Sequence, residues 1–307
     1  MKGIKILGTG LCRGDSRISN FDLAERMDTS DEWIRTKTGI VSRYYAETMT
    51  NGDMASKAAH AAMISSCADE VDLVIVCTFT PDYATPSVAC SVAGSLGLSD
   101  GVCCLDLNGA CSGFVYGMNA AAAMLAGGEF KRALVIGSER ISPLLDPRER
   151  GTSVLFGDGA GAVVLESDPG GTFYMAAGTM PDEHVLYCDR FDPAIMMKGQ
   201  EVYRFAVSRV PENIENLLDK ASLRVSDIDM FVLHQANIRI IESIAKQLGI
   251  PEGKCFVNID RQGNTSAASI PIAIAEMDAA GMLRHGMRIV ASGFGAGLTY
   301  GSMLFTF

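Results

Sequence analysis

The chain has 307 residues, of which 48% are apolar and 20% are charged, and its net charge is −10. This composition is typical of a globular protein with one large core or two domains of ordinary size, and it excludes a disordered chain. The acidic balance argues against a nucleic acid as partner, because contacts to phosphates need a basic face.

Cysteine usage and the first residues indicate the compartment. The nine cysteines are odd in number and most of them lie inside apolar runs. Small buried thiols in a reducing cytosol explain this pattern better than a disulfide framework does. The opening stretch 1–10 lacks the apolar core of a signal peptide, and no run of about 20 apolar residues could span a membrane. We therefore expect a cytoplasmic protein.

In chain order, the first half alternates strand patterns with helix patterns. Residues 70–78 (EVDLVIVCT) and 133–138 (ALVIGS) predict strands that are buried on both faces. Between them, 105–124 (LDLNGACSGFVYGMNAAAAM) predicts an apolar strand, a tight Gly-Ala turn and an alanine-rich helix from about Ser112 to Met124. This alternation predicts right-handed crossovers and a mostly parallel sheet.

The second half repeats this order. At a constant offset of 154 residues Gly109 meets Gly263, and the strand pattern 133–138 meets 287–292 (MRIVAS). Upstream, 70–78 matches 227–235 with a slip of three residues. The turn residues 168–171 (DPGG) mark the boundary. We predict two fused halves, residues 1–168 and 169–307, that form a pseudo-two-fold layered α/β body.

Cys111 stands where a predicted strand ends and a helix begins. Unpaired backbone N–H groups of the first helical turn favour a thiolate, so we expect a pKa below the usual value of about 8.5. A buried structural thiol is the alternative, as for the other eight cysteines. The sequence GACSG also fits a cysteine version of the nucleophile elbow of α/β-hydrolases, with His285 as its base. The duplication is foreign to that fold.

Two polar residues of the second half are candidates for the same site. His234 ends the predicted strand, where open α/β sheets place their sites, and Asn237 is expected to cap a helix that stops at Gly249. Asn264 occupies the turn that mirrors the one before Cys111, so a two-fold axis would bring it to face the thiol. A satisfied core histidine and a helix-capping asparagine remain the alternatives.

Seven segments together resemble the β-ketoacyl-acyl carrier protein synthase III family of the thiolase superfamily. They are DTSDEWIRTKTGI, PSVACSVAGSLG, DLNGACSGF, DPRERGTSVLFGDGAGA, HQANIRII, DRQGNTSAAS and GFGAGLTYGS, and they cover nearly the whole chain. The resemblance implies a thiolase-like α/β fold of two βαβαβαββ halves in a five-layered αβαβα body, and a homodimer. It implies an acyltransferase that starts fatty acid synthesis by ping-pong condensation of an acyl-CoA primer with malonyl-acyl carrier protein.

The same resemblance implies the roles of the site residues. Cys111 matches the acylated nucleophile, and His234 and Asn264 match the two donors that hold the enolate-like oxygen formed when malonyl loses carbon dioxide. The N–H groups of Cys111 and Ala296 match an oxyanion hole, although the family often has glycine at position 296. Thiolases carry a second cysteine in the final glycine loop, and chain-elongating synthases carry histidine at position 264; this chain has neither.

For coenzyme A, the resemblance implies that adenine stacks between Trp33 and Arg150. Further contacts are implied for Thr29, Lys37, Gly199 and Asn237. Lys37 stands where the family usually has arginine, so the charge is kept and the bidentate fork is lost. Thr29 and Glu32 also predict a capping box at the start of a helix. We predict no metal and no cofactor, because coenzyme A enters only as the thioester substrate.

This chain matches the family less completely at the residues that bind the acidic carrier protein and at those that line the primer pocket. The basic patch that the family uses for the carrier corresponds to Arg204, Arg239 and Lys246, together with Gln235, and it should raise the association rate. Thr85 stands where some members place a phenylalanine that caps the partner subunit's acyl pocket, so branched or longer primers have room. The open alternatives are a related polyketide or signalling synthase, a cysteine thioester hydrolase and a silent carrier-binding protein.

Overall fold

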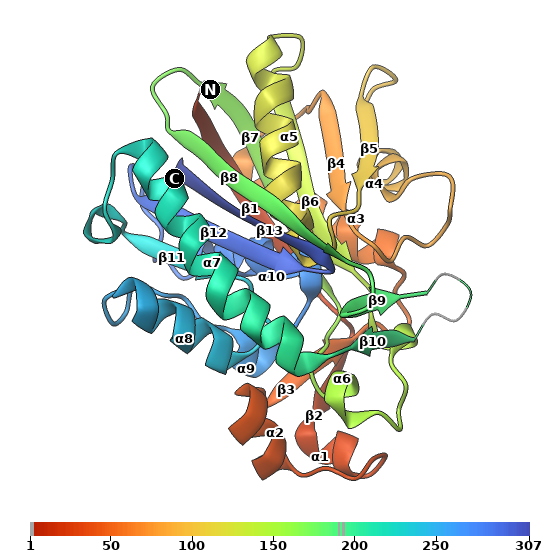
Figure 1. Cartoon of the computed structure of the whole chain (residues 1–307). Helices are drawn as coiled ribbons and strands as arrows, with labels where there is room; N and C mark the ends of the chain where they lie inside the picture. Colours follow the sequence, from red (N-terminus) through yellow and green to blue (C-terminus); the bar gives the residue numbers. More distant parts are fainter. Residues whose placement is uncertain (1–2, 190, 192–193) are drawn as a thin grey trace.

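Two larger sheets dominate the computed structural model, which describes residues 3–189, 191 and 194–307 (Figure 1). The first sheet has the order β1 (Gly3–Arg13), β7 (Gly159–Asp168), β6 (Arg132–Glu139), β4 (Leu73–Cys77) and β5 (Cys103–Leu107). The second has the order β8 (Phe173–Asp182), β13 (Gly297–Thr306), β12 (Arg288–Gly295) and β11 (Met230–Leu233). In each sheet the central strands are apolar along most of their buried length, because helices cover both faces.

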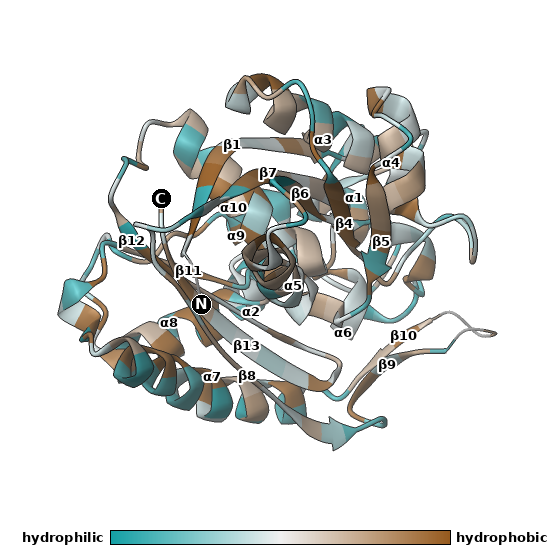
Figure 2. Cartoon of the chain, turned by 90° about the horizontal axis from the view of Figure 1, so that it is seen from above, coloured by the Kyte–Doolittle hydropathy of each residue, from teal (hydrophilic) through white to brown (hydrophobic). Residues whose placement is uncertain are grey.

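The helices form three layers around these sheets, as Figure 2 shows from above. The first sheet is covered on its outer face by α3 (Asn51–Ser66) and α4 (Val88–Leu96), which share one apolar cluster with it. A second cluster joins both sheets through α5 (Gly113–Gly127) and α10 (Ser269–Ala279). The third joins the second sheet to α7 (Gly199–Ala221) and α8 (Ile238–Leu248). The predicted αβαβα layering is confirmed.

The repeat between the halves has a different offset from the one that the sequence predicts. β4 pairs with β6 in parallel, with Leu73 opposite Ala133, and β11 pairs with β12 in the same way, with Met230 opposite Ile289. By these pairs, Leu73 and Met230 are 157 residues apart and Ala133 and Ile289 are 156 apart, whereas the sequence predicts 154. The sequence pattern aligns Gly109 with Gly263. In the structure, the equivalent residues of the turns before α5 and α10 are Ala110 and Ser266, which both have positive φ and are 156 residues apart.

The second half departs from the predicted βαβαβαββ order at one point. Its counterpart of β5 is reduced to a single bridge between Phe231 and Cys255, so β11 has only a short neighbour on that side. The first half keeps β5 as a full strand at the edge of its sheet. β7 ends at Asp168 and β8 begins at Phe173, and the division into two domains there stays a prediction.

Short elements gather at one end of the layered body, in the lower half of Figure 1. They are two two-stranded sheets and several short helical segments: β2 (Ser16–Ser19), β3 (Ser42–Tyr45), β9 (Leu186–Cys188), β10 (Ile195–Met197), α1 (Asn20–Ala24), α2 (Asp31–Thr38), α6 (Arg150–Ser153), α9 (Ile259–Gln262) and η2 (Ser142–Leu144). The remaining short turns are η1 (Ala110–Ser112), η3 (Val225–Asp227) and η4 (Ser266–Ala268). Within the described residues, no helix is long and apolar enough to cross a membrane.

Candidate active site

Cys111 lies in the tight turn η1, between the end of β5 and the start of α5. Ala110 has a φ of 46°, and the Asn108 carboxamide oxygen accepts a hydrogen bond from its backbone N–H at 3.1 Å. Because Ala110 has a left-handed backbone conformation, the chain turns sharply there, and Cys111 lies in this turn immediately before α5. The regular helix begins at Gly113, one residue after the predicted start.

The expected lowering of the Cys111 pKa is wrong for this structure. The side chain is only 8% exposed, and burial raises its pKa to about 12. Desolvation penalises the thiolate more than the hydrogen bond from the Ser266 hydroxyl and a backbone N–H favour it. The negative charge of Glu139 raises the thiol pKa further. A nucleophilic role for this thiol would therefore need a group that takes its proton.

His234 follows β11 and is almost fully buried. Its backbone N–H donates to the Ser292 carbonyl at 2.8 Å, its ring meets Phe294 edge-on, and its Nδ1 lies 2.6 Å from the Ser269 hydroxyl. Burial lowers the pKa of the imidazole to about 3, so the ring is neutral at physiological pH. Because Nδ1 is bound to Ser269, Nε2 is the nitrogen that remains for a substrate.

Asn264 lies in an extended stretch between α9 and η4, and it is nearly buried. Its backbone N–H donates to the Leu155 carbonyl at 2.8 Å, and its carbonyl accepts from the Gly157 N–H at 2.9 Å. The side-chain Oδ1 accepts from the Ser266 N–H at 2.9 Å. Since the backbone holds the oxygen, the Nδ2 amino group remains as the donor of this side chain.

One cavity brings the three residues together. Its volume is about 670 Å³, and its lining includes Cys111, His234 and Asn264. Gly295, which also lines it, lies so close to the thiol that a Cβ there would fall 2.8 Å from the Cys111 backbone nitrogen. Ala296 follows at the turn into β13 and is not among the described residues with positive φ. The cavity thus gathers a thiol and neutral hydrogen-bond donors from both halves.

The hydrolase arrangement does not form. His285 is exposed in the turn that precedes β12, and the lining of the Cys111 cavity does not include it. The histidine that shares the cavity with the thiol is His234, from the second half.

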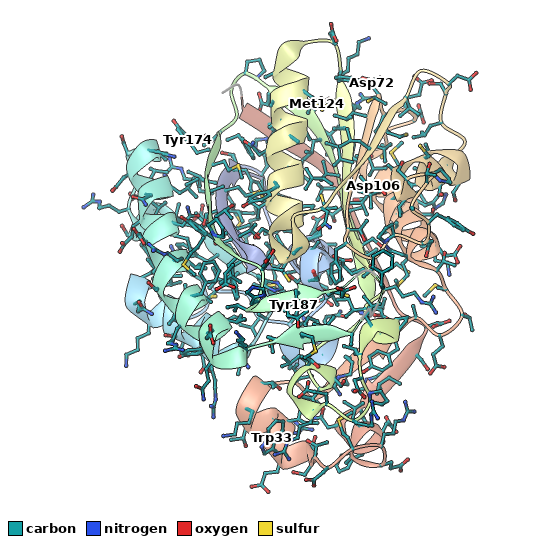
Figure 3. The ribbon with its side chains drawn as sticks, turned by 45° about the vertical axis from the view of Figure 1, so that its right-hand side comes forward. Trp33, Asp72, Asp106, Met124, Tyr174 and Tyr187 are labelled. Carbon is teal, nitrogen blue, oxygen red and sulfur yellow. The ribbon has the colours of Figure 1, made fainter. Side chains whose placement is uncertain are left out.

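The residues matched to coenzyme A surround the outer part of this cavity. Trp33, Lys37, Gly199 and Asn237 line it, and the Arg150 guanidinium lies 4.9 Å from the centre of the Trp33 ring. Figure 3 shows Trp33 at the edge of the molecule, at the opposite end from Met124 of α5. The cavity therefore reaches from the surface to the thiol.

Two local expectations near Trp33 and α8 can be compared with the structure. The residue that caps α2 is Ser30, whose hydroxyl accepts from the Trp33 N–H, so the capping box predicted for Thr29 and Glu32 is wrong and the cap lies one residue later. The Thr29 hydroxyl is instead buried without a hydrogen-bond partner among the described residues. Asn237 caps α8 as expected, and its amide donates to the Lys37 carbonyl at 3.1 Å.

The residues matched to the carrier protein do not all reach the surface. Arg204 on α7 and Arg239 and Lys246 on α8 are exposed, and these two helices pack against each other. Gln235 is fully buried. Its side-chain amide donates to the Leu233 carbonyl at 2.7 Å, and its Oε1 accepts from the backbone N–H groups of Asn258 and Ile259. These hydrogen bonds hold the Gln235 side chain inside the core. The prediction that Gln235 belongs to the carrier-docking surface is therefore wrong.

Thr85 does not line the Cys111 cavity of its own chain. It is exposed in the loop between β4 and α4, and it borders a separate cavity of about 1080 Å³ that Phe79, Tyr83 and Arg140 also line. Any contact of Thr85 with the acyl chain would therefore come from a partner subunit.

Three polar residues of the site were missed in the sequence. Ser266 and Ser269 lie in the segment GNTSAAS, in which the sequence identifies only Asn264 as a candidate, and Glu139 is the last residue of a buried strand. An acidic residue at the end of an otherwise apolar strand was the available signal for Glu139. Only the structure shows that Ser266 donates to Glu139 at 3.1 Å, across the two halves.

Comparison with known proteins gives one family. The family model described as 3-oxoacyl-[acyl-carrier-protein] synthase III matches residues 105–180. The model of the C-terminal part of the same family matches residues 218–307. The chain is 42% identical to the β-ketoacyl-[acyl-carrier-protein] synthase III of Clostridium acetobutylicum, over 99% of this chain and 98% of that protein.

Solved structures agree with this result. The crystal structure of 3-oxoacyl-[acyl-carrier-protein] synthase III from Aquifex aeolicus has a TM-score of 0.95 and 41% identity, covering 99% of this chain and 100% of the other. A priming β-ketosynthase from the R1128 polyketide pathway has a TM-score of 0.95 and 33% identity, covering 99% of this chain and 96% of the other. The chain therefore belongs to the β-ketoacyl-acyl carrier protein synthase III family, the acyltransferases that carry out the initiating condensation of fatty acid synthesis.

Proposed function

We propose that this chain transfers an acyl group from acyl-CoA to Cys111 and condenses it with malonyl-acyl carrier protein. The products are coenzyme A, carbon dioxide and 3-oxoacyl-acyl carrier protein. The observation that carries this proposal is the single cavity that holds Cys111, His234 and Asn264 and opens beside Trp33 and Lys37. A long thioester can reach the thiol only through such a passage.

In the first step the Cys111 sulfur attacks the thioester carbonyl and coenzyme A leaves as its thiolate. The tetrahedral intermediate carries its negative charge on oxygen, and two backbone N–H groups, of Cys111 and Ala296, are assigned to it. The close approach of Gly295 to the Cys111 nitrogen supports this assignment, because no side chain can cover that N–H. Covalent capture divides one difficult transfer into two easier ones.

In the second step malonyl loses carbon dioxide and leaves an enolate whose charge rests on the thioester oxygen. The His234 Nε2–H and the Asn264 Nδ2–H are assigned as its donors. For Nε2 to carry the proton, Nδ1 must accept, so the Ser269 hydroxyl donates to Nδ1. A neutral ring supports this role, because its charge does not change over the physiological range and one of its nitrogens always carries a hydrogen.

The carbanion then attacks the acyl carbonyl on Cys111, and the thiolate leaves. The same oxyanion hole receives the charge a second time. The new carbon–carbon bond stays with the carrier protein, so the product departs as a 3-oxoacyl thioester.

For coenzyme A, we assign the adenine to Trp33 and Arg150 and the rest of the nucleotide and pantetheine to Thr29, Lys37, Gly199 and Asn237. The contact between the guanidinium and the indole ring supports an aromatic ligand there, since both present flat faces. The partnerless Thr29 hydroxyl supports a polar ligand beside it.

For the carrier protein, we assign the docking surface to Arg204, Arg239 and Lys246. No ion pair holds any of the three among the residues that the structure describes. Arg239 also lines the mouth of the cavity, so a carrier bound there would direct its prosthetic arm inward. Exposed charges of this kind mainly raise the association rate.

We propose a homodimer joined at the edge strand β5. Among the described residues, β5 pairs only with β4; its residues are half-buried, and Tyr83 nearby is 66% exposed. An unpaired strand edge with apolar side chains is a template for a second copy. Thr85 would then face the primer of the partner. We also place the reaction in the cytoplasm, which the nine free thiols support.

Product analysis tests the proposal. The chain is incubated with malonyl-acyl carrier protein and a panel of acetyl-CoA, branched and longer acyl-CoA primers, and the carrier species are weighed by mass spectrometry. The expected result is a 3-oxoacyl carrier two carbons longer than the primer. Free fatty acid without condensed carrier would show a hydrolase, and no turnover with any primer would reject the proposal.

A further inference from the structure

One face of the hairpin formed by β12 and β13 lies directly against η1 and the start of α5. On this face Gly293 pairs with Gly301, and Gly295 pairs with Thr299. Directly opposed residues of antiparallel strands point to the same side of a sheet, so these four positions share one surface. A Cβ on any of the three glycines would come within 3.0 Å of an atom of η1 or α5. The glycines therefore allow the turn and the helix start to rest on the hairpin backbone.

Thr299 alone among these four residues has a side chain, and its hydroxyl contacts both segments to which the oxyanion hole is assigned. Its Oγ1 lies 3.1 Å from the hydroxyl of Ser112, the residue after Cys111. The same Oγ1 lies 3.0 Å from the backbone carbonyl of Ala296. The Gly109 carbonyl, at 3.5 Å, is at the limit of a hydrogen bond. One hydroxyl thus connects the turn of the first half to the hairpin turn of the second.

The hydrogen atoms of this contact can be assigned. A hydroxyl has one hydrogen and a carbonyl can only accept, so Thr299 donates to the nearer carbonyl, that of Ala296. The Ser112 hydroxyl then donates to Thr299 Oγ1. Ser112 is fully buried, and within the described part of the chain its hydroxyl has no other hydrogen-bond partner. Two consecutive hydrogen bonds therefore run from Ser112 through Thr299 to Ala296.

We propose that Thr299 is a positioning residue that sets the distance between the two N–H groups of the oxyanion hole. The inference rests on the proposed function. The Cys111 N–H comes from the first half and the Ala296 N–H from the second, so neither segment alone fixes their separation. Among the described residues, only the Thr299 side chain hydrogen-bonds to both η1 and the hairpin turn. A hydrogen bond weakens steeply as its angle departs from linear, so two donors stabilise one oxygen only if both are held in place.

The position of Thr299 determines which steps should depend on it. A tetrahedral oxyanion forms when the thiol is acylated and again when the carbanion attacks the acyl group. The enolate of decarboxylation is assigned instead to His234 and Asn264, which follow β11 and α9 and belong to other segments of the second half. Loss of the Thr299 hydroxyl should therefore slow acylation and condensation and leave decarboxylation nearly unchanged.

Single-turnover rates test the proposal. Thr299→Val removes the hydroxyl and keeps the shape of a half-buried side chain. We expect acylation by acetyl-CoA to slow by about 10- to 100-fold, with malonyl decarboxylation within about threefold of wild type. Thr299→Ser keeps the hydroxyl and should restore most of the rate, and Thr306→Val, the same exchange at the far end of β13, should acylate like wild type. A valine variant as fast as wild type, equal loss of both half-reactions, or a serine variant as slow as valine would each overturn the proposal.

Ser112→Ala interrupts the same pair of hydrogen bonds from the other end, and it covers the case in which Thr299→Val does not fold. We expect this variant also to acylate more slowly than wild type while its decarboxylation is retained. The double variant should be as slow as Thr299→Val alone, within about threefold, because the hydrogen bond that Ser112 donates is already lost there. Wild-type acylation by Ser112→Ala, or losses that multiply in the double variant, would overturn the connection through Thr299.

The carbonyl band of the acyl enzyme reports on the oxyanion hole directly. Infrared difference spectra are recorded on acetyl-Cys111 prepared from acetyl-CoA that carries an isotope label at the carbonyl carbon. We expect the band to move to higher frequency in Thr299→Val, because the carbonyl is less polarised, and to return in Thr299→Ser. An unchanged band in the valine variant would overturn the positioning role, since packing alone explains a slower rate. If wild type forms no acetyl adduct, the proposed function is wrong; an adduct with the same band in all variants rejects only the role of Thr299.

Discussion

The turn before α5 and the turn before α10 share one backbone shape. In the first, Asn108 Oδ1 accepts from the N–H of Ala110, whose φ is 46°. In the second, Asn264 Oδ1 accepts from the N–H of Ser266, whose φ is 49°. Each turn is followed by a short 3₁₀ segment and then by a buried helix. The two halves therefore repeat a scaffold down to single hydrogen bonds.

The side chains around the two turns differ. Cys111, the proposed nucleophile in the first half, corresponds to Ala267 in the second, 156 residues on. Opposite each turn stands the last residue of a central strand: Gly295 faces Cys111, and Glu139 faces Ser266. Duplication supplied two equivalent positions at one axis, and the sequence then specialised one for the nucleophile and the other for donors and an acid.

Removing the nucleophile should have the largest effect. Cys111→Ala leaves the scaffold intact, because the second half already carries alanine at the equivalent position. We expect acylation to fall below detection, a loss of more than about 10³-fold, with malonyl decarboxylation retained. Intact-mass analysis after incubation with acetyl-CoA measures the first, and carbon dioxide release the second. An adduct on the variant would place the nucleophile elsewhere.

Removing a donor of the second half should have the complementary effect. His234→Ala takes one hydrogen bond from the enolate, which we expect to cost about 10²- to 10³-fold in decarboxylation. Acylation of Cys111 should stay near the wild-type rate, because the thiol belongs to the other half. Single-turnover measurements of the two half-reactions separate the effects. Equal loss of both would show that His234 acts on the thiol and that the division between halves is wrong.

Gly295 offers a test of the space beside the thiol. In Gly295→Ala the new Cβ would lie 2.8 Å from the Cys111 nitrogen and 2.9 Å from its Cβ, closer than side chains approach. We expect acylation to slow by about 10²-fold through the displaced oxyanion donor, with coenzyme A affinity unchanged. Equilibrium binding of coenzyme A is the control. A variant that acylates like wild type would remove the Cys111 N–H from the mechanism.

Ser269 fixes the tautomer of His234 and should matter less than the ring itself. Ser269→Ala leaves Nδ1 without its partner, so the ring populates both tautomers and rotates more freely. We expect decarboxylation to fall by about 10-fold. Ser269→Thr keeps the hydroxyl and should restore much of the rate. If alanine and threonine variants were equally slow, packing rather than the hydrogen bond would explain the loss.

Charge reversal on α8 should have the smallest effect. Arg239→Glu is expected to lower kcat/KM for malonyl-acyl carrier protein by about 10-fold at low salt, and less as salt rises, because exposed charges act mainly on association. Acylation from acetyl-CoA serves as the control and should change by less than about twofold. An equal change in the two substrates would place the carrier on another surface.

The sequence predicted the layers because buried parallel strands and alanine-rich helices leave a strong periodic pattern. It predicted the three catalytic candidates because each stands at the end of a strand or in a turn next to a helix. It did not predict the offset of 156 residues between the two turns. Gly109 and Gly263 are the same residue type, but they have different backbone conformations, so they are not equivalent positions. Conformation, not identity, defines the repeat.

The protonation states and polar contacts could not be predicted from local sequence. The thiol pKa depends on burial by the opposite half, which outweighs the helix start. Gln235 follows His234 in a polar segment, yet its amide makes its hydrogen bonds inside the core. Glu139 meets Ser266 over 127 positions of sequence. Each of these depends on contacts between segments that are distant along the chain.

The most direct test of the central claim is peptide mapping of the acyl enzyme before and after addition of malonyl-acyl carrier protein. The account predicts one acyl group on the peptide that contains Cys111, and its disappearance as 3-oxoacyl carrier forms in equal amount. An acyl group on any other residue, or one that malonyl-acyl carrier protein leaves in place, would contradict the assignment of the thiol and its partners to a single condensing site.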